Sequence, residues 1–230
     1  MKKRILTAGT LAIIACAITA YCWAAGQENN SNEATKGTVL EQQQKSVAVA
    51  SKGKSLVVYF SVPETDGVDA SSGASRVLSG GEIMGSTHYV ASIIGEATGS
   101  DLFEIKTLHT YPGSHKALIE AAKKEIDNNA RPKLATHIEN LKDYEVVFIG
   151  FPNWWYDMPM PLYTFFDEYD FSGKTVIPFC THGGSSFSDA IKTIRELEPK
   201  ATVLDGYAIA RSQVSESKER VLEWLKKIGF

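Results

Sequence analysis

Apolar positions between residue 54 and the C-terminus follow two alternating patterns. Short runs rich in β-branched and aromatic residues predict strands, most of them buried on both faces. Segments in which apolar residues recur every three or four positions predict helices. The expected strands cover residues 55–61, 102–105, 145–150, 174–180 and 201–209, and the expected helices cover 87–97, 114–128, 160–169, 186–197 and 214–228. Pro178 is unusual inside the fourth expected strand, because proline has no backbone N–H to donate to a neighbouring strand.

The alternation of five strands with five helices predicts an α/β fold with a parallel sheet covered on both faces. Right-handed crossovers and short loops leave few strand orders, and the doubly wound order 2-1-3-4-5 is the one we expect. In that order the chain reverses direction between strands one and three. The reversal opens a crevice at the carboxyl ends of these strands, where ligands bind.

The first 53 residues have a different composition from the rest. Three basic residues precede an uncharged apolar stretch that ends at Ala25, which is the layout of a signal peptide. Residues 1–25 are also long enough to stay uncleaved as a membrane anchor. A lipoprotein box at Cys16 is a third alternative, although the apolar residues after it argue against this one.

Residues 26–53 are polar, lack aromatic residues and are typical of a disordered linker or tether. We therefore expect one folded domain over residues 54–230. We also expect an exported protein, periplasmic or otherwise extracytoplasmic, that contacts a membrane only through its N-terminal segment.

Composition narrows the function classes. Of 230 residues, 43% are hydrophobic and 22% are charged, and the net charge is −3. These values exclude a fibrous, wholly disordered or polytopic membrane protein, and they give no reason to expect a nucleic-acid partner. Cys180 is the one cysteine outside the leader, and no Cys/His spacing resembles a zinc site. No Ser-His-Asp order or paired carboxylates indicate hydrolysis.

Three loops carry the unusual residues, and each follows a strand that ends at the expected crevice. The first loop ends with Gly85, Ser86, Thr87 and His88, where a helix begins. Hydroxyls and amides at a helix N-terminus bind phosphate without help from lysine or arginine. The alternative is that Ser86 or Thr87 only caps the helix.

The second loop places three aromatic residues in a row between prolines. It contains Pro152, Asn153, Trp154, Trp155 and Tyr156. Exposed tryptophan is costly, and flat aromatic faces suit the stacking of a planar ring. We expect one tryptophan to fill the core under the loop, which leaves the others available to a ligand.

The third loop, Thr181, His182, Gly183 and Gly184, pairs two glycines. Glycine lets the backbone approach a ligand closely and frees amides to point at its polar edge. The alternative is an ordinary strand-to-helix turn with an exposed His182. The expected position of this loop, opposite the aromatic loop, favours the binding role.

Together these segments resemble the flavodoxin family, in particular flavodoxin-like proteins with Gly-Phe/Tyr-Pro-x-Trp-Trp and Pro-Phe-Cys-Thr-His-Gly-Gly-Ser motifs. The two motifs lie here at residues 150–155 and 178–185, and residues 57–61 resemble the first strand of that family. The resemblance covers residues 54–230. It implies a flavodoxin-like doubly wound five-stranded parallel sheet with helices on both faces, and FMN as a non-covalently bound cofactor.

The resemblance also assigns roles to residues. It implies that the FMN phosphate is held by Ser61, Ser86, Thr87 and His88. It implies that the isoalloxazine ring lies between two groups, Pro152, Asn153, Trp154, Trp155 and Tyr156 on one side and Thr181, His182, Gly183 and Gly184 on the other. We expect a protonated His182 near the pyrimidine edge of the ring to tune the reduction potential with pH.

Two features depart from the family. Residues 62–84 form an insertion in the first strand-helix loop, which we expect to be a lid, a short hairpin over the site, or a surface excursion without function. Tyr156 stands where relatives often have glycine, so the outer face of the ring is more crowded.

Three functions are compatible with this sequence. The first is an electron carrier of the flavodoxin type that docks a redox partner protein. The second is an FMN-dependent oxidoreductase that passes electrons from NAD(P)H to a small quinone-like acceptor. The third is a binding domain on the same fold that has lost the flavin.

Overall fold

The computed structural model describes residues 53–65 and 75–230. The predicted leader over residues 1–25 and nearly all of the predicted linker over 26–53 lie outside the described residues. Within the described segments, no helix combines the length and apolar character that crossing a membrane requires.

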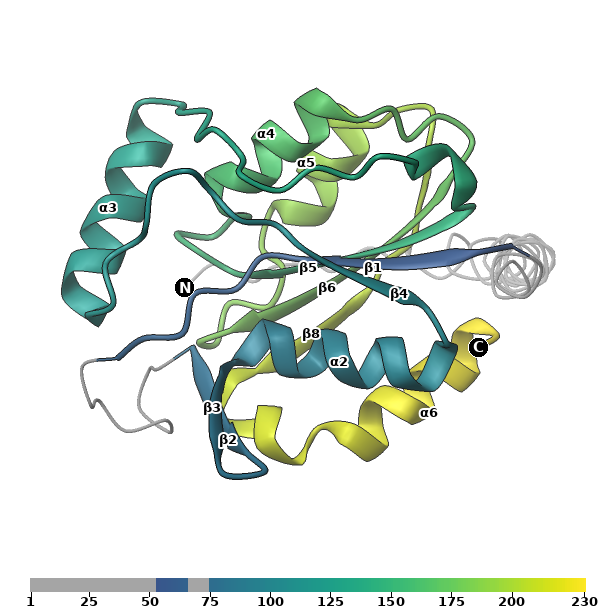
Figure 1. Ribbon diagram of the computed structural model, residues 1–230, viewed down its shortest axis with the longest axis horizontal. Helices are drawn as coiled ribbons and strands as arrows, with labels where there is room; N and C mark the ends of the chain where they lie inside the picture. Colours follow the sequence, from purple (N-terminus) through teal and green to yellow (C-terminus); the bar gives the residue numbers. More distant parts are fainter. Residues whose placement is uncertain (1–52, 66–74) are drawn as a thin grey trace, which may run out of the picture. The chain divides into compact units, whose positions relative to one another are not determined.

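A parallel sheet forms the centre of the domain (Figure 1). Its strands run in the order β4-β1-β5-β6-β7, and β8 also pairs with β6. The strands are β1 (Ser55–Tyr59), β4 (Asp101–Glu104), β5 (Val146–Pro152), β6 (Thr175–His182), β7 (Thr202–Val203) and β8 (Tyr207–Ala210). The doubly wound order 2-1-3-4-5 is therefore confirmed.

The predicted fifth strand is in fact two, so the sheet has six strands. β7 pairs with Thr175 and Val176, and β8 pairs with β6 only from Phe179 onward. The break lies beside Pro178, which has no N–H for the ladder. Gly206, with a φ of +72°, passes the Pro178 carbonyl so closely that a Cβ on it would lie 2.2 Å from that oxygen.

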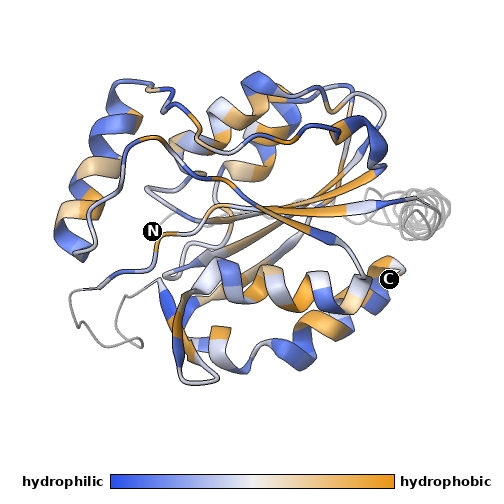
Figure 2. Cartoon of the chain, in the orientation of Figure 1, coloured by the Kyte–Doolittle hydropathy of each residue, from blue (hydrophilic) through white to orange (hydrophobic). Residues whose placement is uncertain are grey.

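Helices cover both faces of the sheet (Figure 1). Successive β1 side chains alternate between two cores: Val58 packs with α3, α4 and α5, whereas Val57 packs with α2 and α6. The helices are α2 (Ser86–Thr98), α3 (His115–Asp127), α4 (Met160–Glu168), α5 (Ala190–Leu197) and α6 (Lys218–Ile228). Apolar residues gather along the sheet and on the inner helix faces, and polar residues on the outer faces (Figure 2).

Two helices begin later than predicted. α5 begins at Ala190 instead of residue 186, because Ser186 and Ser188 have φ values of +55° and +49°, which a right-handed helix cannot contain. The last helix is preceded by a separate 3₁₀ segment, η2 (Arg211–Glu216). Another 3₁₀ turn, η1 (Leu141–Asp143), precedes β5.

A hairpin forms at the C-terminal end of the insertion. β2 (Arg76–Ser79) pairs antiparallel with β3 (Glu82–Gly85). Gly80 and Gly81 both have positive φ, +59° and +88°, as a two-residue type I′ turn requires. Val77 is buried against the α2 side of the core, which fixes the hairpin to the domain.

Candidate functional site

A cavity of about 650 Å³ lies where β1, β5, β6 and β8 end. Its size is that of a small-molecule or cofactor site. Ten of the thirteen candidate residues line it, namely Ser86, Pro152, Asn153, Trp154, Trp155, Tyr156, Thr181, His182, Gly183 and Gly184. The structure therefore brings the helix start and both later loops to one place.

Ser86 is the first residue of α2, and its hydroxyl is suited to an anion. The oxygen is buried and has no hydrogen-bond partner within the described part of the chain. The helix has no side-chain cap, because Gly85 is the N-cap residue, and no acidic residue in its first turn. First-turn amides have no acceptor within the helix, and the helix dipole favours negative charge there. This end of the cavity is therefore able to bind a phosphate.

The other three phosphate candidates do not line the cavity. Thr87 Oγ1 lies 2.9 Å from Thr181 Oγ1 in a buried hydrogen bond. The His88 ring stacks on Tyr59, with centroids 4.9 Å apart.

Ser61 lies against the start of α2. A Cβ on Gly85 would come within 2.0 Å of Ser61 Oγ, so only glycine fits at position 85. Although the insertion separates the two residues in sequence, the chain returns to Ser61 before the helix begins.

The aromatic loop is a strained turn. The Trp154 N–H donates to the Asp157 carbonyl at 2.9 Å, and the Asp157 N–H donates back to the Trp154 carbonyl at 3.2 Å. The two residues between them, Trp155 and Tyr156, have φ values of +53° and +69°. Such turns normally contain Asn-Gly, and each bulky residue in this conformation costs about 1–3 kcal/mol. Strain of this size is typical of functional sites.

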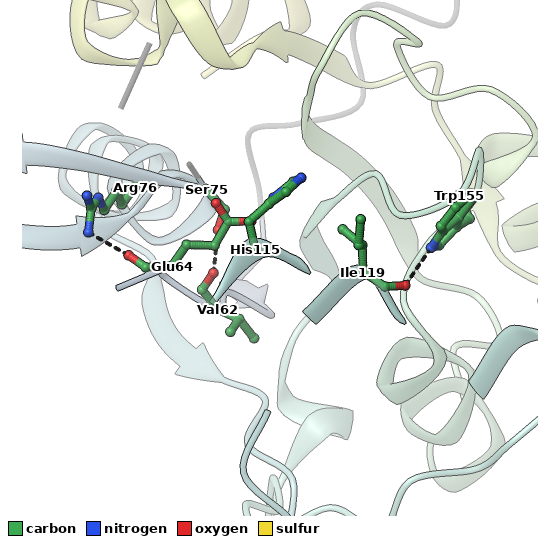
Figure 3. A network of polar contacts seen from close by, with 7 residues as sticks. All are labelled: Val62, Glu64, Ser75, Arg76, His115, Ile119 and Trp155. Atoms are coloured by element: carbon green, nitrogen blue, oxygen red, sulfur yellow. Dashed lines mark hydrogen bonds and ion pairs between the residues drawn. The ribbon is translucent and has the colours of Figure 1, made fainter. Parts of the chain in front are cut away.

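As expected, one of the two tryptophans is packed in the core and the other is exposed. Trp154 packs edge-on against Phe60 and Tyr111, with centroids 5.5 and 5.4 Å apart, and so fills the core under the loop. Trp155 is 45% exposed and Tyr156 is 66% exposed. The indole N–H of Trp155 donates to the Ile119 carbonyl of α3 at 3.0 Å, which ties the loop to that helix (Figure 3).

The second and third loops are joined directly. The Asn153 backbone N–H donates to the Thr181 carbonyl at 2.8 Å, and its side-chain amide donates to the Ser186 carbonyl at 2.9 Å. These two hydrogen bonds join the loops where β5 and β6 end.

His182 differs from the protonated residue that we expected. Its Nδ1 accepts the Gly184 N–H at 3.0 Å, so this nitrogen carries no proton. Burial lowers the pKa of His182 from its ordinary value of 6.5. Both observations favour a neutral imidazole with its proton on Nε2.

Arg211 is a cavity residue that sequence reasoning missed. It follows β8, whose last residue, Ala210, pairs with His182, so the guanidinium reaches Gly183. A Cβ on Gly183 would lie 3.2 Å from Arg211 Nη1. Across the described residues, no carboxylate forms an ion pair with this arginine. Its role at the cavity follows only from the register of β8 against β6, because the residues around it in the sequence form no recognisable motif.

Further missed residues line the side of the cavity next to α3. Glu64 Oε1 lies 2.7 Å from His115 Nδ1, and Arg76 donates to the Glu64 backbone carbonyl at 2.8 Å (Figure 3). The remaining members of this group are Ser75, Leu118, Ile119 and Ala122. They come from the insertion and from α3, neither of which carried a recognisable motif.

Comparisons with known proteins find similarity to flavodoxins and flavoproteins. A family model described as flavodoxin matches residues 79–228. A "putative flavoprotein" structure from Bacteroides uniformis ATCC 8492 is 30% identical over 76% of this chain and 98% of its own, with a TM-score of 0.58. One of the same description from Bacteroides eggerthii DSM 20697 is 26% identical over 78% and 99%, with a TM-score of 0.60. A search of curated proteins finds no match.

Proposed function

This chain belongs to the flavodoxin family, and from that premise we propose that it is an FMN-binding electron-transfer protein. The observation that carries the proposal is the unpartnered Ser86 hydroxyl at the start of α2, in the same cavity as the exposed Trp155 and Tyr156. A phosphate-binding end and a stacking end are what a flavin mononucleotide requires.

The residues present fit FMN. Ser86 and the first turn of α2 would hold the phosphate, and the aromatic and glycine loops would hold the ring. FMN supplies the electron-transfer chemistry when it is bound, and the protein sets orientation, potential and access. Neutral His182 and the Gly183 amide would face the ring without adding charge, whereas Arg211 would add one positive charge.

A visible spectrum of the purified chain, followed by titration with FMN, tests this proposal. We expect flavin absorption and quenching of FMN fluorescence on binding. Ser86→Ala should lower the affinity for FMN about tenfold and leave that for riboflavin, which has no phosphate, nearly unchanged. A colourless chain that ignores added FMN would contradict the proposal and favour the flavin-less alternative.

A second candidate function is an FMN-dependent reductase of the NAD(P)H:quinone type. The apolar side of the cavity along α3 favours it, because an enzyme needs room beside the ring for a second reactant. A reductive titration with two separate one-electron steps would support the carrier, which docks a redox partner protein. Rapid NADPH oxidation in the presence of a quinone would support the reductase.

We also propose export, on the layout of residues 1–25. Fractionation of cells that produce the full chain tests this, with an N-terminally truncated chain that starts at residue 26 as the control. Recovery of the full chain in the cytoplasm would contradict export.

A further inference from the structure

One part of the cavity is not accounted for by the residues assigned to FMN. Glu64 and His115 lie there beside the inner face of α3, which contributes Leu118, Ile119 and Ala122. Leu118 and Ala122 are buried, and Ile119 is partly exposed. This part therefore combines an apolar surface with a carboxylate and an imidazole.

Glu64 is the unusual member of the group. The residue is only 3% exposed, yet its Oε2 has no hydrogen-bond partner within the described part of the chain. Its Oε1 is already occupied by His115, and its side chain turns away from Arg76, which binds the backbone carbonyl instead (Figure 3). Burying an unpaired carboxylate oxygen is unfavourable, and buried polar atoms in native proteins nearly always have a partner.

A carboxylate oxygen accepts hydrogen bonds, so a hydrogen-bond donor suits Oε2 as a partner. The neighbouring surface requires the rest of that ligand to be apolar. α3 supplies the aliphatic side chains of Leu118, Ile119 and Ala122 on that side of the cavity. Flat aromatic compounds that carry a hydroxyl group satisfy both conditions.

We propose that Glu64, positioned by His115, binds the hydroxyl of a flat aromatic compound that lies along α3. The inference rests on the proposed function only in that this ligand would lie next to the flavin. His115 is a positioning residue here: its bond to Oε1 fixes the carboxylate so that Oε2 receives the ligand.

Isothermal titration calorimetry with two probes tests the proposal on the FMN-loaded chain. The first probe is 1-naphthol, and the second is 1-methoxynaphthalene, which has the same ring system but no hydroxyl hydrogen. We expect 1-naphthol to bind about tenfold more tightly than its methyl ether, because only 1-naphthol can donate to the buried Oε2. In Glu64→Gln the ratio of the two affinities should fall to near one, because the amide can donate to either oxygen.

Two further variants sharpen the test. Glu168→Gln is the matched control, since Glu168 also pairs with a histidine, His137, at 3.4 Å, but does not line the cavity. Its affinity ratio should equal that of the unchanged chain. Ile119→Ala should weaken both probes by the same factor and leave the ratio unchanged.

Three results would overturn the proposal. These are no binding of either probe, an affinity ratio that Glu64→Gln leaves unchanged, or a loss of FMN affinity in Glu64→Gln as large as that in Ser86→Ala. The last result would assign Oε2 to a hydroxyl of FMN itself. Whether the chain binds FMN is measured separately, by a visible spectrum taken before either probe is added. If it binds none, the titration with the two probes is repeated on the flavin-free chain.

Discussion

At the scale of single residues, several side chains at the cavity lower the stability of the ligand-free domain. The Ser86 hydroxyl and one oxygen of the Glu64 carboxylate are buried and have no hydrogen-bond partner among the described residues. Trp155 and Tyr156 occupy a backbone conformation that suits glycine. The proposed ligands would supply partners for the two buried oxygens and would stack on the two exposed rings.

Tyr156 allows strain to be separated from ring stacking. Tyr156→Gly and Tyr156→Ala remove the same exposed ring, but only glycine adopts a φ of +69° without strain. We expect the glycine variant to be more stable than the alanine variant by about 1 kcal/mol in denaturant unfolding of the flavin-free chain. Equal stabilities would show that the turn is not strained.

Arg211 is expected to contribute to anion binding. Arg211→Gln should lower the affinity for FMN about tenfold, because a charge-assisted contact is lost. Fluorescence titration with FMN and with riboflavin locates that contact: a loss confined to FMN places it at the phosphate, and an equal loss for both places it at the ring. Arg220→Gln is the control, since Arg220 bonds to the Gln213 carbonyl and does not line the cavity. If Arg211→Gln binds FMN as tightly as this control does, the guanidinium takes no part in binding.

At the scale of elements, the positions of the cavity loops depend on the residues at which β5, β6 and β8 end. β5 and β6 are the longest strands, and their last residues, Pro152 and His182, already belong to the cavity wall. The interrupted fifth strand places β8 beside the end of β6, so Arg211 follows next to Gly183. The break near Pro178 therefore helps to position a cavity residue.

Gly206 should be essential to this break. Gly206→Ala should destabilise the chain by about 2–4 kcal/mol, because the added Cβ meets the Pro178 carbonyl in addition to the positive φ. Gly99→Ala is the control, since Gly99 has a similar φ of +66° but open space around its Cα, and should cost about 1 kcal/mol. Equal losses in chemical denaturation would show that the close approach does not matter.

At the scale of the whole domain, two cores on opposite faces of one sheet support the cavity at the ends of its strands. Because the cavity belongs to the folded state alone, a ligand there stabilises the domain by mass action. FMN at one hundred times its dissociation constant should raise the free energy of unfolding by about 2.7 kcal/mol.

Thermal unfolding with and without FMN measures this effect. A domain of this size should gain roughly 5–10 °C in melting temperature. Ser86→Ala at the same FMN concentration should gain less. An unchanged melting temperature at saturating FMN would contradict binding to the folded domain.

Much of the fold and part of the site were open to prediction from sequence. Residues 55–61 and 145–150 gave correct strands because a buried parallel strand is apolar on both faces. The aromatic loop was recognisable because three aromatic residues in succession in a loop are hard to explain by packing alone, and two of them are in fact exposed. The start of α5 was wrong because Ser186 and Ser188 follow a left-handed path, which their sequence does not indicate.

Local pattern was therefore enough for the order of elements and the two motif loops, since apolar periodicity and turn residues act over a few positions. The strand order was expected because it is the commonest arrangement of five such units and because the chain resembles the flavodoxin family. The contact between His182 and the Gly184 N–H, the placement of Arg211 against Gly183 and the pairing of Glu64 with His115 emerged only once the chain was folded. The last two depend on residues from separate elements that meet at the strand ends, and distance in space is not encoded in any short stretch of chain.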